Sequence, residues 1–228
     1  MHILPIIVLG VCYFFFLFCL HALTLDDFVF FKKHITTERV FNIAFLTAGV
    51  SLFSARLVYV FFHLSLAFLN PLVFFLFPYF PGLSLGGSII GGLLFLFLYI
   101  RSQKLPFARF VDFFALSFLC AFPIGLLAQI FTTKKPFDHI VLTGGIVIAF
   151  IFFVFCVRLF QKKRMQEGSS GILSLPVIVI VAFVTGFVGK TEQVLFFLSR
   201  DDFLLIGIFI VSLIILFRQE NVLGKIRK

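Results

Sequence analysis

The sequence predicts an all-α membrane protein: a polytopic bundle of about seven transmembrane helices, with the N-terminus outside and the C-terminus inside. Three observations predict this fold. Apolar residues make up 61% of the 228 residues, and the mean hydropathy is +1.18, whereas a soluble domain must keep a largely polar surface. Long apolar segments follow one another along most of the chain. Nearly all lysine and arginine residues lie in alternate connections between these segments.

The apolar segments divide into seven helices that can cross a membrane and one shorter piece. The helices are expected near residues 3–23, 41–64, 83–100, 110–131, 139–160, 172–189 and 203–217. Residues 66–80 are interrupted by Pro71 and Pro78 and fall short of the ~20 residues that cross ~30 Å of hydrocarbon. We expect residues 66–80 to form a short re-entrant or interfacial segment.

The basic residues predict the orientation. They follow the first, third, fifth and seventh helices, as Lys32, Lys33 and Arg39; Arg101, Lys104 and Arg109; Arg158, Lys162, Lys163 and Arg164; and Arg218, Lys225, Arg227 and Lys228. The other side has only Lys134, Lys135, Lys190 and Arg200. The positive-inside rule then puts the N-terminus outside. These clusters account for the net charge of +9, so we expect no nucleic-acid partner.

A single transmembrane domain over residues 1–228 is the simplest organisation. The first helix is too long for a signal peptide and lacks a basic leading region, so we expect it to remain attached. Metal-ligand spacing is absent, and no cofactor or metal is expected. The four cysteines are expected to be small packing residues: Cys12, Cys19, Cys120 and Cys156.

Arg56 is the most informative polar residue inside an expected helix. Burying arginine at the bilayer centre costs ~2.5–3.5 kcal/mol on insertion scales. One hypothesis is that its side chain snorkels to the outer head groups. The other is that it faces the bundle and binds an anion such as a lipid phosphate, which its depth and the neighbouring Tyr59 favour.

Paired glycines open the next helix, in P-G-L-S-L-G-G-S-I-I-G-G at residues 81–92. Close helix packing explains such glycines in most membrane helices, and we assign Gly91 and Gly92 this structural role. The serines of this stretch lie one turn apart near the depth of Arg56 and are candidates to line the same cavity. The residues expected to bind lipid are Arg56, Tyr59, Ser84, Gly86, Gly87 and Ser88.

Other polar residues lie near helix ends. Asp112 opens the fourth helix beside Arg109, where an interfacial ion pair would give it a structural role. Gln129 closes the same helix on the outer side. The histidines His21, His63 and His139 have no carboxylate at triad-like spacing, so we interpret them as interfacial.

Several motifs together resemble one family. They are T-T-E-R at residues 36–39, S-A-R-L-V-Y-V-F-F at 54–62, the glycine-rich stretch at 81–92, L-Y-I-R at 98–101, L-P-F at 105–107 and V-D-F-F-A at 111–115. These motifs are similar to those of the prolipoprotein diacylglyceryl transferases. That family moves diacylglycerol from phosphatidylglycerol to the lipobox cysteine of a lipoprotein precursor, in the bacterial plasma (inner) membrane.

The sequence departs from the family at catalytic positions. Gly86 stands where the resemblance implies a catalytic histidine, and Leu126, Gln129 and Lys134 stand in place of an arginine, an asparagine and a glutamate. The family's late tyrosine, arginine and glutamate have no match in residues 172–189. Of the functional residues that the resemblance implies, the chain keeps Arg56 and Asp112, and Tyr13 corresponds to the tyrosine of the family's first helix. The resemblance therefore implies Arg56, Gln129 and Tyr13 as catalytic candidates.

Three hypotheses remain open. The first is a divergent transferase that uses Arg56, Gln129 and either Tyr13 or His63 in altered roles. The second is a non-catalytic relative, a pseudoenzyme, that binds phosphatidylglycerol or another anionic phospholipid, or the precursor's signal peptide. The third is a small transporter or channel, although the sequence lacks the repeats and broken helix pairs that would support it.

Overall fold

All regular structure among the described residues is helical, and seven of the helices are long and apolar enough to cross a membrane. The computed structural model describes residues 4–25, 27–63, 82–132, 136–162, 167–188 and 200–219. The helices are α1 (Leu4–Leu25), α2 (Phe28–Lys32), α3 (Thr37–Phe62), α5 (Leu85–Ser102), α6 (Phe107–Thr132), α7 (Pro136–Gln161), α8 (Ser169–Val188) and α9 (Arg200–Gln219). The predicted all-α bundle of seven transmembrane helices is confirmed. The expected segment at 66–80 lies outside the described residues.

Capping residues explain where the helices begin. The helix expected from residue 41 starts at Thr37, because the Thr36 hydroxyl accepts a hydrogen bond from the backbone N–H of Arg39 at 3.3 Å. The short α2 was not predicted from sequence. It starts after Asp27, whose carboxylate accepts hydrogen bonds from the N–H groups of Val29 and Phe30, each at 3.0 Å.

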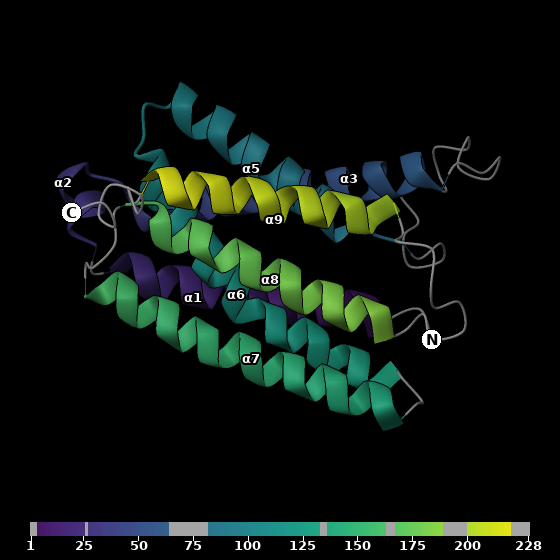
Figure 1. The fold of residues 1–228 in the computed structure, drawn as a ribbon. Coiled ribbons are helices and arrows are strands. Elements are labelled where there is room, and N and C mark those ends of the chain that lie inside the picture. Colours follow the sequence, from purple (N-terminus) through teal and green to yellow (C-terminus); the bar gives the residue numbers. More distant parts are fainter. Residues whose placement is uncertain are drawn as a thin grey trace.

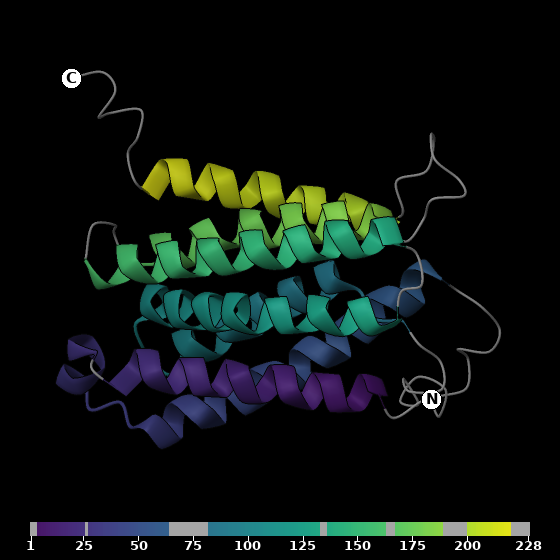
Figure 2. The ribbon, with the colours of Figure 1, turned by 90° about the horizontal axis from the view of Figure 1, so that it is seen from below.

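The long helices run along one common direction, with α6 inside the bundle (Figures 1 and 2). Helix α6 packs against α1, α7 and α8, while α3 pairs with α5, and α8 with α9. The side chains of Phe110, Phe113, Leu116 and Leu119 on α6 are fully buried. Helix α6 therefore forms the apolar centre on which the outer helices pack.

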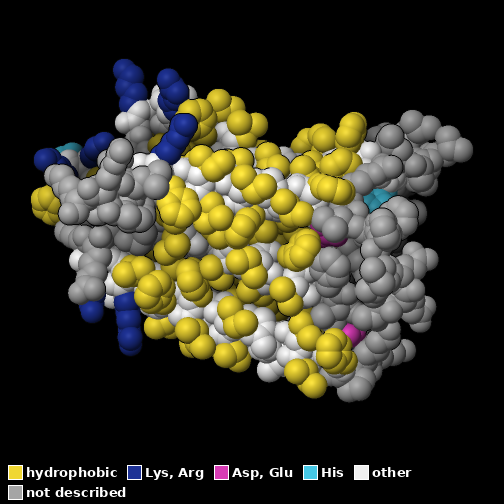
Figure 3. Space-filling view, in the orientation of Figure 1, with side chains coloured by type: hydrophobic (Ala, Val, Ile, Leu, Met, Phe, Trp, Pro, Cys, Tyr) yellow, Lys and Arg dark blue, Asp and Glu magenta, His cyan; other side chains and the backbone are white. Residues whose placement is uncertain are grey.

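Hydrophobic side chains cover the sides of the bundle, and lysine and arginine gather at one end (Figure 3). We call this end the basic end; it holds the last turns of α1, α5, α7 and α9 and the first turns of α3, α6 and α8. Its described basic residues are Lys32, Lys33, Arg39, Arg101, Lys104, Arg109, Arg158, Lys162 and Arg218. The alternation predicted from sequence thus places these charges together. Which side of the membrane the basic end faces stays a prediction.

Glycines bring α5 directly against α3. A Cβ added at Gly91 would lie 2.2 Å from Cβ of Ser54, and one at Gly87 would lie 2.7 Å from Cβ of Val58. The Ser51 hydroxyl donates a hydrogen bond across this contact to the Ser88 carbonyl oxygen at 2.8 Å. Small residues are needed here because the two backbones approach too closely for side chains between them.

We predict that Gly91→Ala lowers the stability of the bundle by about 1–3 kcal/mol, since the added methyl group overlaps Ser54. Gly49→Ala, on α3, is the matched control because no atom lies within 4 Å of its added Cβ. This control should be neutral or stabilising by up to about 1 kcal/mol through helix propensity. Unfolding of both variants in detergent measures the difference, and equal stabilities would contradict the close α3–α5 contact.

Candidate functional site

Arg56 lies inside the bundle near the end opposite the basic end. Its side chain is 3% exposed, and Nη1 donates a hydrogen bond to the carbonyl oxygen of Gly82 at 2.8 Å. The guanidinium lies 5.7 Å from the centroid of the Tyr59 ring, which stacks on His63 with centroids 4.4 Å apart. The Arg56 side chain is thus held within the protein, whereas the anion binding that the sequence suggested for it stays a prediction.

Gly82 and Ser84 fix the start of α5 beside Arg56. Gly82 has φ +147°, and a Cβ there would lie 2.1 Å from Cζ of Tyr59, so only glycine fits. The backbone N–H of Ser84 donates to the Ala55 carbonyl at 3.1 Å, and its hydroxyl caps α5 by accepting from the Gly87 N–H at 3.1 Å. The positive end of the α5 dipole and the Arg56 charge therefore lie at the same end of the bundle, an arrangement that favours an anion.

A cavity of about 290 Å³ lies between α1, α3, α5 and α6, with one residue from α8. Its wall is mostly aliphatic and aromatic, with hydroxyl groups from Tyr13, Thr47, Ser51 and Ser88. Of the residues expected to bind lipid, Ser88 lines this cavity. The other members of that set belong to the Arg56 end of α3 and α5 or to the contact between them. Arg56 itself lies one helical turn beyond the cavity-lining Leu52, about 6 Å along α3.

The hydroxyl groups of the cavity differ in how they are used. Thr47 donates to the Ile43 carbonyl at 2.7 Å, Ser51 to Ser88 at 2.8 Å and Ser88 to Leu85 at 2.8 Å. The buried hydroxyl of Tyr13 has no partner among the described residues. Its ring is held by Phe16 and Phe45, with centroids 6.0 and 5.4 Å away. Among the hydroxyl groups of the cavity-lining residues, that of Tyr13 is therefore the one with no hydrogen bond to a described residue.

Two positions at which the sequence departs from the family are used for packing. A Cβ at Gly86 would lie 3.0 Å from Cβ of Leu204 on α9, so α9 occupies the space beside it. Leu126 is 3% exposed and packs with Leu142 and Val181. Gln129 lies exposed near the end of α6 and does not line the cavity. Among the described residues, no group of three or more His, Cys, Asp or Glu side chains could hold a metal ion.

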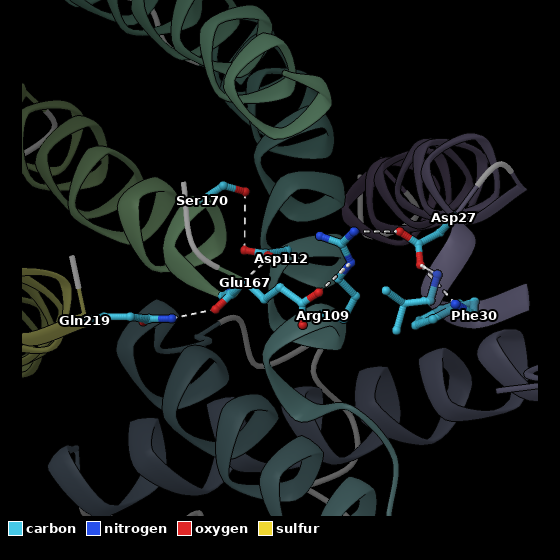
Figure 4. A network of polar contacts seen from close by, with 9 residues as sticks. Asp27, Phe30, Arg109, Asp112, Glu167, Ser170 and Gln219 are labelled. Atoms are coloured by element: carbon cyan, nitrogen blue, oxygen red, sulfur yellow. Dashed lines mark hydrogen bonds and ion pairs between the residues drawn. The ribbon is translucent and has the colours of Figure 1, made fainter. Parts of the chain in front are cut away.

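Asp112 caps α8 from α6 (Figure 4). Its carboxylate is 1% exposed and accepts hydrogen bonds from the backbone N–H groups of Gly168 and Gly171, each at 2.7 Å, and from the Ser170 hydroxyl at 3.2 Å. The N–H groups at a helix start lack partners within the helix, and this carboxylate accepts hydrogen bonds from two backbone N–H groups there. The helix expected near residues 172–189 therefore starts earlier, at Ser169.

Arg109 pairs with other carboxylates than the one expected. Its Nη2 lies 3.1 Å from Oδ2 of Asp27, and its Nε lies 4.0 Å from Oε1 of Glu167. The guanidinium also stands 5.0 Å from the centroid of the Phe160 ring, and Gln219 donates a hydrogen bond to the Glu167 carbonyl (Figure 4). These contacts join α6 to the segment before α2, to α7, to the start of α8 and, through Glu167, to the end of α9. The hypothesised Arg109–Asp112 ion pair is replaced by this network.

Comparison with known proteins identifies one family. The family model for prolipoprotein diacylglyceryl transferase matches residues 3–134, which is more than half of the chain. No curated protein matches the sequence. The matched region contains Tyr13, Arg56 and Asp112, and it contains every cavity-lining residue except Leu175.

We predict that Asp112→Ala destabilises the fold strongly, because each buried donor left without an acceptor costs about 1–3 kcal/mol. Asp112→Asn keeps one carbonyl oxygen and should lose less. Ser170→Ala, which removes only the longest of the three hydrogen bonds, is the control and should cost least. Chemical unfolding in detergent ranks the three variants; an Asp112→Ala protein as stable as Ser170→Ala would show that the cap contributes little.

Proposed function

The chain belongs to the prolipoprotein diacylglyceryl transferase family, and from that premise we propose that it transfers diacylglycerol from phosphatidylglycerol to lipoprotein precursors. The acceptor is the lipobox cysteine of the precursor's signal peptide. The site of action is the bacterial inner membrane, with the basic end of the bundle on the cytoplasmic side by the positive-inside rule.

The cavity carries this proposal. It lies almost wholly in the region that matches the family, and its wall is apolar apart from a few hydroxyl groups. Its volume of about 290 Å³ is close to the lower limit of small-molecule pockets, about 300 Å³. A cavity of this size and chemistry suits one acyl chain of a glycerolipid, which gains about 25 cal/mol for each Å² of apolar surface removed from water.

Arg56 supplies the charge for the lipid's phosphate. Arg56 lies beyond the cavity, toward the end of the bundle that holds the positive N-terminus of α5. One lipid molecule can therefore place an acyl chain in the cavity and its phosphate near Arg56. Guanidinium groups bind phosphate through short, charge-assisted hydrogen bonds. Tyr59 holds the guanidinium from one side, and the Tyr13 hydroxyl offers a donor to an ester oxygen within the cavity.

The transfer makes a thioether and releases glycerol phosphate. The cysteine sulfur forms a bond to a glycerol carbon, the bond from that carbon to the phosphate oxygen breaks, and the phosphate leaves with the electron pair. The thiol must lose its proton, and the departing phosphate gains from a nearby cation. In this proposal Arg56 stabilises the leaving phosphate, and Tyr13 is the candidate for proton transfer. Gln129 has no titratable group and lies outside the cavity, so it stays a candidate for positioning alone.

A second candidate function is lipid or signal-peptide binding without transfer. The packing around Gly86 and Leu126 favours it, because α9 and an apolar cluster fill the space next to positions where the family carries a histidine and an arginine. Loss of one transition-state partner commonly costs ~10²–10³ in rate. This alternative predicts affinity for phosphatidylglycerol without product.

The decisive experiment incubates the purified protein with phosphatidylglycerol and a lipobox peptide and detects the diacylglyceryl adduct by mass spectrometry. The transferase hypothesis predicts adduct from the native protein and a loss of at least about 10²-fold in Arg56→Ala. Arg56→Lys keeps the charge without the planar fork and should fall between them. Absence of adduct from protein that still binds the lipid would support the non-catalytic alternative.

A separate test concerns the cavity. Ala48→Phe places a ring into the cavity from α3 and should abolish the stabilisation that phosphatidylglycerol gives against thermal unfolding. Ala22→Phe makes the same change at an exposed position of α1 outside the cavity wall, and protection should persist there. Equal protection of both variants would mean that the acyl chain binds elsewhere.

A further inference from the structure

The short helix α2 is held firmly at the basic end by one buried ring. Phe30 is 3% exposed, and its ring centroid lies 4.9 Å from those of Phe110 and Phe113 on α6. The Asp27 cap fixes the start of α2, and Asp27 is in turn bound to Arg109 at 3.1 Å. The orientation of α2 relative to the bundle is therefore set by packing and by an ion pair.

This orientation turns two phenylalanines outward. Phe28 is 68% exposed and Phe31 is 81% exposed, the largest exposed fraction among the large hydrophobic side chains that the structure describes. Lys32 and Lys33 follow directly and are also exposed. Exposed aromatic rings beside ammonium groups are typical of segments that lie at the boundary between acyl chains and head groups.

Further cations surround α2. Arg39 donates a hydrogen bond to the side chain of Gln103 at 2.8 Å, which joins the start of α3 to the turn between α5 and α6. Arg101 lies in the last turn of α5 and Lys104 in the turn that follows it, so with Lys32, Lys33 and Arg39 five basic side chains gather at the basic end, where Figure 3 shows dark blue groups. Of the nearby described carboxylates, Asp27 is paired with Arg109 and Glu38 is exposed at the start of α3.

We propose that α2 and these cations form a docking surface for anionic glycerophospholipids of the leaflet that meets the basic end. Phe28 and Phe31 enter the acyl layer, and Lys32, Lys33 and Arg39 contact the phosphates. The excess of positive charge selects anionic over zwitterionic head groups. The surface is separate from the cavity and from Arg56, which lies near the other end of the bundle.

The absence of tryptophan from the chain permits a direct test. Phe31→Trp introduces a single fluorescent reporter, and the protein is placed in nanodiscs that contain either brominated phosphatidylglycerol or brominated phosphatidylcholine at equal fractions. Bromine quenches tryptophan on contact. Phe150→Trp is the matched control, because this residue of α7 is 59% exposed on the side of the bundle, and α7 holds no lysine or arginine within two turns of it.

The proposal predicts stronger quenching of the Phe31→Trp reporter by the anionic lipid and equal quenching of the control by both lipids. Replacing Lys32, Lys33 and Arg39 by glutamine should lower the preference by about fivefold for each residue at low salt. If the triple variant does not fold, raising the ionic strength of the single Phe31→Trp protein should reduce the same preference. Equal quenching by the two lipids at Phe31→Trp, or no quenching by either, would overturn the proposal.

Discussion

The buried carboxylate of Asp112 is the interaction on which the arrangement of the helices depends. It lies on α6, the helix at the centre of the bundle, and takes the donors of Gly168, Ser170 and Gly171 at the start of α8. A Cβ at Gly171 would lie 2.7 Å from the Val111 carbonyl oxygen, so the two helices meet at backbone contact. A carboxylate buried in an apolar bundle is costly unless it is fully hydrogen-bonded, which makes any other docking of α8 unfavourable.

The features proposed for lipid binding and those that the family's chemistry needs separate in this chain. The proposed binding site consists of an apolar cavity wall, small residues between α3 and α5, and the cation Arg56. These features follow from how the helices pack. Transfer also needs a base for the thiol, and the space beside Gly86 and Leu126 is filled by other helices. In the proposed function, lipid binding needs the cavity and Arg56, whereas transfer needs these and a base for the thiol as well, so binding is able to persist without transfer.

Hydropathy and charge predicted the seven helices because a bilayer imposes length and polarity on each helix separately. Contacts between distant residues could not be predicted in this way. Asp112 lies 56 residues before Gly168. The sequence around Asp112 offers Arg109 as a partner and gives no sign that the carboxylate binds the start of a distant helix. Helix α2 has only five residues, too few to show a helical pattern in the sequence. Its position depends on the packing of Phe30 against α6. Ser84 and Ser88 looked equivalent by spacing, but Ser84 caps α5 and Ser88 lines the cavity.

The polar contacts at the basic end connect the part of the chain that matches the family to the part that does not. Asp112 and Arg109 lie within residues 3–134, whereas Gly168, Ser170, Gly171 and Glu167 lie beyond them. Helix α8 is nearly all aliphatic, yet its first turn is held by the matched region and its Leu175 lines the cavity. Helix α8 therefore needs a first turn that Asp112 can cap and an apolar face that packs on the bundle. Many sequences satisfy both requirements. The cavity, which the earlier helices form almost entirely, therefore places few requirements on the residues after 134.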